Sequence, residues 1–199
     1  MGYVKISIKY IMVAASILPV ALHKGKIYFL FGKENEMEDS AKGFSDFGGR
    51  VEEGESIMGT ALREGSEELS GFLGDSNAIK KLLRGGIYKL SHGEYHIHIF
   101  LMKYDENLPG YFTNHHRFVW ERMDKDVLND SKYFEKQEIR WFSIEDMRTK
   151  KKLFRKFYQE IVEHILGDIQ KITAFVKKSS SEKGIYSKTR KTMKIMKGG

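Results

Sequence analysis

A glycine turn followed by a helix that carries three glutamates constrains this chain more than any other feature of its sequence. The stretch covers residues 48–71 and reads Gly-Gly-Arg-Val-Glu-Glu-Gly-Glu-Ser-Ile-Met-Gly-Thr-Ala-Leu-Arg-Glu-Gly-Ser-Glu-Glu-Leu-Ser-Gly. Its helical part is expected over residues 55–69, where about 100° of rotation per residue places Glu64, Glu67 and Glu68 on one face. Because crowded carboxylates repel one another, this arrangement predicts a bound cation.

The chemistry of the three glutamates favours a hard divalent cation. Carboxylate oxygens without histidine or cysteine suit Mg²⁺, with Mn²⁺ as a substitute. The opposite face of the helix carries small or apolar residues, namely Ile57, Ala61, Gly65 and Leu69. We expect that face to pack closely on a sheet while the acidic face binds metal. The alternative interpretation is an acidic helix face that is simply solvated.

The same stretch resembles the Nudix box, whose pattern is G-x5-E-x7-R-E-U-x-E-E-x-G-U, with U a bulky apolar residue. The residues in register are Gly49, Glu55, Arg63, Glu64, Glu67 and Glu68. Three positions depart from the pattern: Gly65 replaces an apolar residue, Ser70 replaces the second glycine, and Gly71 replaces the last apolar residue. The displaced glycine predicts that the helix ends one residue later, with Gly71 as its left-handed cap.

The resemblance implies a metal-dependent hydrolase that cuts a diphosphate linkage, typically in a nucleoside diphosphate joined to another group. It implies that Glu64, Glu67 and Glu68 bind the metal, that the carbonyl of Gly48 adds a ligand, and that one of these glutamates or a later one is the general base. Arg63 would hold the preceding loop by pairing with one of three acids, Glu52, Glu53 or Glu55. The negative charge of a diphosphate repels a nucleophile until cations neutralise it, and Mg²⁺ would supply the neutralising charge.

Residues outside the box supply further site candidates. In the resembling family, an acidic residue shortly before a Trp-Phe strand completes the metal site or acts as the base, and Glu135 and Glu138 both qualify. We favour Glu135, because Glu138 can pair with Arg140. Aromatic and basic side chains between residues 105 and 134 could stack a nucleobase and hold phosphates, or could pack in the core. The candidates for substrate binding are Phe118, Trp120, Tyr133 and Arg117.

Hydrophobic periodicity predicts the elements around the box. The apolar run at residues 10–22 has the charged start of a signal peptide, but no cleavage site follows, and about 13 residues cannot span a bilayer. We interpret it as a buried strand over residues 14–22 that turns at Lys24-Gly25 into a second strand over residues 27–33.

Later elements are a helix at 77–84, strands at 87–90 and 95–104, a Trp-Phe strand near 141, a short helix from Ile144, and a long amphipathic helix over 151–176 broken near Gly167. With the resemblance, this order implies an α/β fold, a Nudix-like α/β/α sandwich with a mixed central sheet, a catalytic strand-loop-helix and a long C-terminal helix.

The positive charge of the chain is concentrated at its C-terminal end. The whole chain carries a formal net charge of +7, and residues 177–199 contain eight Lys or Arg against one Glu, so the preceding 176 residues are neutral overall. We expect a Nudix domain over residues 1–176 and a basic, flexible tail over residues 177–199. The tail could contact RNA or another polyanion, fold on a partner, or increase solubility. The absence of cysteine favours a reducing compartment such as the cytoplasm, which for a viral chain means the host cytoplasm or the virion.

Three classes of function are compatible with the sequence. The first is hydrolysis of a nucleotide or capped-RNA substrate, with the mRNA 5′ cap (decapping) favoured because a basic tail could hold the RNA body. Dinucleotide polyphosphates, nucleotide sugars and inositol pyrophosphates are alternative substrates. The second is a non-catalytic Nudix module that binds nucleotide or RNA. The third is a structural or packaging protein whose tail is its working part. Nothing in the sequence fixes the oligomeric state.

Overall fold

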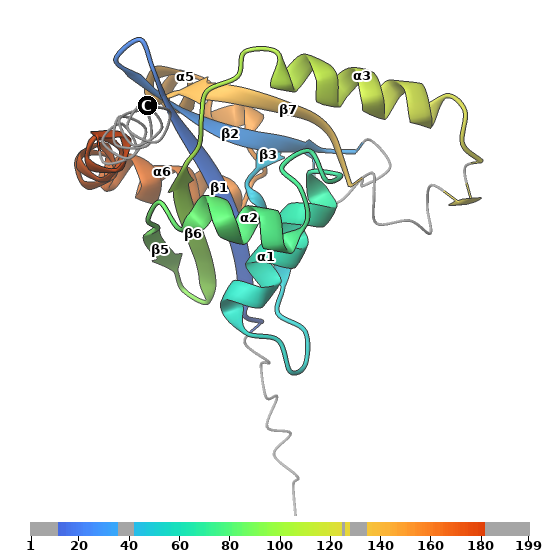
Figure 1. Cartoon of the computed structure of the whole chain (residues 1–199), viewed down its shortest axis with the longest axis horizontal. Coiled ribbons are helices and arrows are strands. Elements are labelled where there is room, and N and C mark those ends of the chain that lie inside the picture. The colour runs from blue at the N-terminus through green and yellow to red at the C-terminus, as the bar shows by residue number, and fades with distance from the viewer. Residues whose placement is uncertain (1–11, 36–41, 125, 128–134, 182–199) are drawn as a thin grey trace, which may run out of the picture.

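The central sheet contains seven strands and is covered by helices on both faces (Figure 1). The computed structural model describes residues 12–35, 42–124, 126–127 and 135–181. The strands are β1 Ala14–His23, β2 Lys26–Glu34, β3 Phe44–Ser45, β4 Phe47–Arg50, β5 Tyr88–His92, β6 Tyr95–Leu101 and β7 Lys136–Ser143. Strands β1 and β6 are parallel and the other pairs are antiparallel, so the sheet is mixed. The predicted α/β/α sandwich is confirmed.

Strand β1 positions Gly48 and Gly49. The sequence predicts these two glycines as a turn, but that prediction is wrong, because both lie in the extended strand β4. Strand β1 pairs with β2 and β6, and at its N-terminal end also with β4, where Ser16 lies opposite Gly48. The turn into β2 has left-handed backbone at Lys24 (φ +48°) and Gly25 (φ +76°), the conformation that a tight hairpin requires. The predicted hairpin is therefore confirmed, with β2 reaching Glu34.

One face of the sheet carries α1 (Ile57–Glu68) and α2 (Ser76–Leu83). Side chains alternate along β1, so Ala15 and Ile17 point into the core beneath these helices. The core on this side contains Phe47, Ala61, Leu62, Ile79, Leu83, Phe100 and Phe112. The predicted packing of the small face of α1 against the sheet is confirmed for Ala61, Gly65 and Leu69, which are buried, but not for Ile57, which is exposed.

The other face carries α5 (Ile144–Thr149), α6 (Tyr158–Gly167) and a helix over residues 169–181. Its core includes Leu18, Val20, Phe29, Phe31, Tyr158, Ile161, Ile165, Ile172 and Val176. The predicted short helix from Ile144 is α5, and Ser143 caps it: the Ser143 hydroxyl accepts from the Asp146 N–H, and the Asp146 carboxylate accepts from the Ser143 N–H, forming a capping box.

The C-terminal helix differs from the prediction in its bounds. A short 3₁₀ turn, Lys151–Leu153, precedes α6, and the expected interruption falls at Asp168, directly after Gly167. The helix then continues to residue 181, five residues into the predicted tail, while residues 182–199 lie outside the described part of the chain. Among the described residues, no helix is long and apolar enough to cross a membrane.

Helix α3 (Leu108–Trp120) occupies a region for which the sequence pattern predicts no helix. It lies along β7, beside the face that carries α1 (Figure 1). Leu108 and Phe112 anchor it in the core, and Phe72, from the loop after α1, packs against Phe112 with a ring separation of 5.2 Å. The helix therefore forms a wall on the α1 side of the sheet.

Candidate metal and catalytic site

The two glycines of β4, Gly48 and Gly49, lie against the acidic residues of α1. The Gly48 N–H donates to Glu68 Oε2 at 2.8 Å, which ties β4 to the last turn of the helix. A Cβ on Gly48 would lie 2.3 Å from Ser16 Cβ, and one on Gly49 would lie 2.3 Å from Glu64 Oε1. Glycine is needed at position 48, because a side chain there would overlap the backbone of β1, whereas a side chain at position 49 would displace the carboxylate of Glu64.

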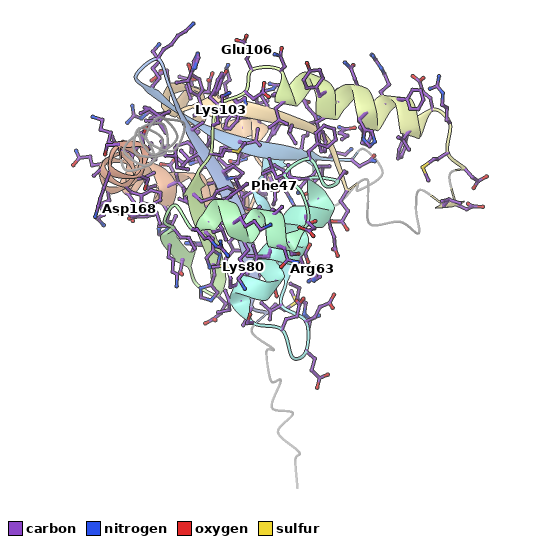
Figure 2. The ribbon with its side chains drawn as sticks, viewed as in Figure 1. Phe47, Arg63, Lys80, Lys103, Glu106 and Asp168 are labelled. Carbon is purple, nitrogen blue, oxygen red and sulfur yellow. The ribbon has the colours of Figure 1, made fainter. Side chains whose placement is uncertain are left out.

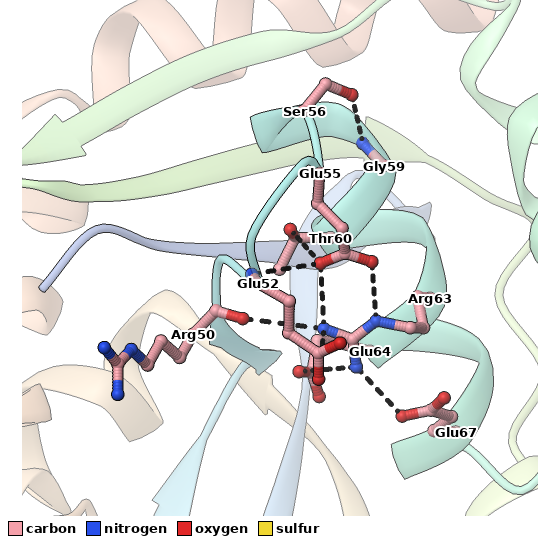
Figure 3. Close-up of polar contacts among 9 residues, drawn as sticks. All are labelled: Arg50, Glu52, Glu55, Ser56, Gly59, Thr60, Arg63, Glu64 and Glu67. Carbon is pink, nitrogen blue, oxygen red and sulfur yellow. Dashed lines mark hydrogen bonds and ion pairs between the residues drawn. The ribbon is translucent and has the colours of Figure 1, made fainter.

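Arg63 connects the loop before α1 to the carboxylates of α1 (Figure 3). Its guanidinium reaches Glu55 at 2.8 and 3.1 Å, Glu64 at 2.9 Å and Glu67 at 3.1 Å, with Glu52 at 3.8 Å. Arg63 thus makes the predicted pairing with Glu55 and Glu52. The hydrogen bonds from Arg63 and Thr60 lower the pKa of Glu55 to about 2, so this acid is ionised at any ordinary pH.

A buried chain of alternating charges continues from the site into the protein. Glu68 lies 3.0 Å from the ammonium of Lys136, which also pairs with Glu34, and Glu34 in turn accepts from Arg155 at 2.7 Å. Glu34, Glu68 and Lys136 are all buried. Burial raises the pKa of Glu68 well above its ordinary value, with Lys136 opposing the shift and Glu34 and Glu135 adding to it.

The two later glutamates have separate places. Glu138 pairs with Arg140 at 2.5 Å on β7, as the sequence analysis anticipates. Glu135 directly precedes β7, and burial raises its pKa there, with the charges of Glu64 and Glu67 raising it further. Glu135 therefore belongs to the electrostatic environment of the α1 acids.

The donors at this site fit a hard divalent cation. They are carboxylate oxygens from α1 and Glu135 beside the backbone of β4. Burial is the main reason that the pKa values of Glu68 and Glu135 are raised, and neighbouring glutamates raise both further. Within the described ranges, no three of the acids or histidines already converge as a closed metal cage. Arg63 and Lys136 instead lie among them.

The substrate-binding candidates fall on the far half of α3, except Tyr133, which lies outside the described residues. Phe118 is 58% exposed, and the guanidinium of Arg122 lies 4.0 Å from its ring centroid. Trp120 stacks on His116, and Arg117 donates to Asn114. The three described candidates share one helix but have different partners.

A cavity of about 650 Å³ lies elsewhere, between the β1–β2 turn, the loop after α1 and the β6–α3 connection. Lys103 and Glu106, which help to line it, lie toward the top of Figure 2, whereas Arg63 lies toward the bottom. His23 and Ser16 are seven residues apart on β1, so the cavity lies roughly 20 Å from the glycines of β4.

A second buried polar group lies behind the glycines of β4. Asp46 accepts hydrogen bonds of 2.5 Å from the hydroxyls of Ser16 and Tyr95, and burial raises its pKa to about 6. Asp46 was not predicted from the sequence, and neither were Lys136 and Glu34. The sequence gives little indication of these three residues, because each is a polar residue at the end of an apolar strand or shortly before the glycines of β4.

The departures from the box pattern have local structural consequences. A Cβ on Gly65 would lie 2.2 Å from Ile17 Cδ1, so β1 supplies the bulk that the helix lacks. The prediction that the helix ends one residue late is wrong: α1 ends at Glu68, and Ser70 (φ +49°) and Gly71 (φ +72°) both adopt left-handed backbone. Ser70 thus takes the conformation of the glycine it replaces.

Comparison with known proteins places the chain in a family. The NUDIX domain model matches residues 11–165, and no curated protein matches the chain. An Ap4A hydrolase from C. elegans is 16% identical with a TM-score of 0.44, over 80% of this chain and 98% of that one. The NUDIX domain of Shewanella oneidensis NrtR, solved with ADP ribose, is 12% identical with a TM-score of 0.49, over 84% and 94%. The Nudix hydrolase RenU from M. smegmatis is 12% identical with a TM-score of 0.44, over 82% and 87%. Because the family match spans well over half of the chain, including β1, α1 and β7, this chain belongs to the NUDIX domain family.

Proposed function

We propose that this chain is a Mg²⁺-dependent hydrolase, with Mn²⁺ as a substitute, that cuts the diphosphate linkage of a nucleoside diphosphate derivative. The observation that carries the proposal is the crowding of four carboxylates, those of Glu64, Glu67, Glu68 and Glu135, beside β4, where Arg63 and Lys136 supply two positive charges. Such a cluster reduces stability unless it serves to bind a cation.

Each residue has a distinct part in this proposal. Glu64, Glu67 and Glu68 would hold the cation together with the carbonyl of Gly48. A divalent cation bound there would neutralise the diphosphate and make a nearby water more acidic. Arg63 orients Glu64 and Glu67 through the contacts already described, so it acts by positioning other groups.

Glu135 is the proposed general base. Its carboxylate would take a proton from water as the water oxygen bonds to phosphorus, while the bond from that phosphorus to the bridging oxygen breaks. The products are a nucleoside monophosphate and a phosphorylated remainder. The raised pKa of Glu135 supports this role, because a more basic carboxylate is a better proton acceptor at neutral pH.

The 5′ cap of RNA is the substrate that we favour. Phe118 and Arg117 on α3 offer an exposed ring and a cation, which could stack a base and hold phosphate. The basic residues beyond position 181 could hold the RNA body. Dinucleotide polyphosphates, nucleotide sugars and inositol pyrophosphates are the alternatives, and the lack of cysteine suits a cytoplasmic enzyme.

A substrate panel with Mg²⁺ and with Mn²⁺ tests the proposal. The panel contains capped RNA, a cap dinucleotide, Ap4A, ADP ribose, a nucleotide sugar and an inositol pyrophosphate. Glu67→Gln and Glu135→Gln should each lower kcat by about a hundredfold or more, because each removes a group that acts in the reaction itself. Glu145→Gln, an exposed acid on α5, is the matched control and should keep wild-type activity.

Intact substrates throughout the panel would contradict the hydrolase proposal. A non-catalytic module that binds nucleotide would then be the better interpretation, provided that the wild-type chain still bound a member of the panel. Full activity of Glu135→Gln together with loss in Glu138→Gln would move the base to Glu138.

A further inference from the structure

Lys136 is a buried cation placed between two acids, one of which belongs to the proposed metal site. Its side chain is 1% exposed, and its ammonium lies 3.0 Å from Glu68 Oε1 and 3.1 Å from the hydroxyl of Ser45. It also pairs with Glu34. The other oxygen of Glu68 accepts from the Gly48 N–H at 2.8 Å. Both oxygens of Glu68 therefore already have a partner within the protein.

The protein is shaped to keep the lysine there. Gly32 on β2 leaves space for the lysine stem, because a Cβ at that position would lie 3.0 Å from both Cγ and Cδ of Lys136. Glu34 is fixed in turn by Arg155 Nη1 at 2.7 Å. An ammonium that is packed along its stem and bonded to three groups cannot swing away at low cost.

This placement sets two cations in competition for one carboxylate. A divalent ion that approaches Glu68 meets the ammonium on the same carboxylate, and charges a few ångströms apart in a buried site interact strongly. Removing the ammonium would leave Glu68 as a buried, unpaired anion, which is costly to the fold unless another cation replaces it.

We propose that Lys136 is a positioning residue that holds Glu68 in place and acts as an internal competitor of the divalent cation, so that it stabilises the metal-free site and weakens metal binding. This inference rests on the proposed function of the same site. It implies that the free protein binds the divalent cation weakly and that an anionic substrate, which adds negative charge, strengthens that binding.

Binding of Mn²⁺ alone, followed by electron paramagnetic resonance of the full-length chain, tests the competition. Lys136→Met should bind Mn²⁺ more tightly, by on the order of tenfold or more, because one positive charge has left the site. Glu34→Gln should bind it more weakly, because Lys136 then has Glu68 as its only anionic partner among the contacts described here. A purely structural role for this ion-pair chain would weaken binding in both variants.

Thermal unfolding supplies a second measurement that does not depend on activity. Without metal, Lys136→Met should unfold at a lower temperature than the wild-type chain, and Mn²⁺ should raise its Tm by more than it raises that of the wild type. Lys136→Arg keeps the charge and should not gain affinity. If Lys136→Met fails to fold, Lys136→Gln replaces it: this variant also removes the charge but keeps a hydrogen-bond donor, so it should bind Mn²⁺ more tightly than the wild type, and weaker binding would contradict the competition.

The outcomes separate this inference from the function on which it rests. If the wild type binds Mn²⁺ and hydrolyses substrate, two results would each overturn the role of Lys136 alone. One is unchanged or weaker Mn²⁺ binding by Lys136→Met. The other is unchanged or tighter Mn²⁺ binding by Glu34→Gln. A wild-type chain that neither binds Mn²⁺ nor hydrolyses any member of the panel would overturn both.

Discussion

Arg63 links the loop before α1 to the acidic face of α1. Its guanidinium is shared between Glu55 on the loop side and Glu64 and Glu67 on the helix. A planar guanidinium with five donors can serve several carboxylates at once, which a lysine at this position could not do with the same geometry. The loop conformation is therefore coupled to the position of the proposed metal ligands.

The Glu55–Arg63 contact should make stability depend on pH in the acid range. The pKa of Glu55 is about 2 in the folded chain against an ordinary value of 4.5, so its contribution is complete above about pH 4.5 and is lost as pH falls toward 2. Glu55→Gln should lower the free energy of unfolding by about 1 to 2 kcal/mol at pH 7.

Urea denaturation of both proteins at several pH values measures this effect. The difference between Glu55→Gln and the wild type should shrink steadily below pH 4.5. A difference that stays constant down to pH 2.5 would mean that Glu55 contributes through packing and not through its charge.

At the scale of single residues, the sequence predicted contacts that are local or carried by the motif. The pairings of Arg63 with Glu55 and of Glu138 with Arg140 follow from short separations along the chain. Lys136 was not predicted, because its partner Glu34 is 102 residues away and only the pairing of β2 with β7 brings them together. Asp46 was missed for the same reason, since its partner Tyr95 is 49 residues away.

At the scale of elements, α1 packs against β1 because a small residue of the helix faces a large residue of the strand. Gly65 leaves a gap on the helix, and Ile17 fills it from the strand. Ile17 is fully buried and β-branched, so it cannot turn aside for an added methyl group. The missing apolar residue of the motif is thus compensated by a neighbour in space.

A double-mutant cycle tests the packing of Gly65 against Ile17. Gly65→Ala should destabilise the wild-type chain by about 1 to 3 kcal/mol through overpacking against Ile17. In the Ile17→Ala background the same change should be neutral or stabilising, because the clash is gone and alanine favours a helix by up to about 1 kcal/mol over glycine. Urea denaturation gives all four free energies, and additive effects would show that the two residues do not interact.

The bounds of some elements could not be predicted, for identifiable physical reasons. Ser70 takes left-handed backbone although it is not a glycine, so α1 ends earlier than the displaced glycine indicated. Helix α3 was hidden by Pro109 and Gly110, which usually mark loops. Proline in the first turn of a helix costs no hydrogen bond, because the N–H that it lacks has no acceptor there.

At the scale of the whole molecule, the mixed sheet separates two hydrophobic cores and places the acidic site at one end of β1. The sandwich could be predicted because the resemblance to the Nudix family implies it, and because the apolar runs of β1 and β2 and the helical period of residues 151–176 agree with that order of elements. The substrate could not, because residues on α3 are positioned by tertiary packing and Tyr133 lies outside the described residues. The distribution of charge is a separate property of the chain, and it leads to a prediction about RNA.

Six of the basic residues lie beyond the helix that ends at residue 181, at positions 183, 188, 190, 191, 194 and 197. If these six residues contact RNA phosphates, the affinity for long capped RNA should fall steeply as the salt concentration rises. Replacing all six with glutamine should reduce the slope of log K against log salt by up to about four. Hydrolysis of a cap dinucleotide should be unchanged in that variant, because a dinucleotide lacks the run of backbone phosphates that the basic residues would contact. Titrations of both proteins between about 50 and 200 mM salt provide the measurement. Equal slopes would exclude the basic tail from RNA binding and leave the charge of the chain without a part in substrate selection.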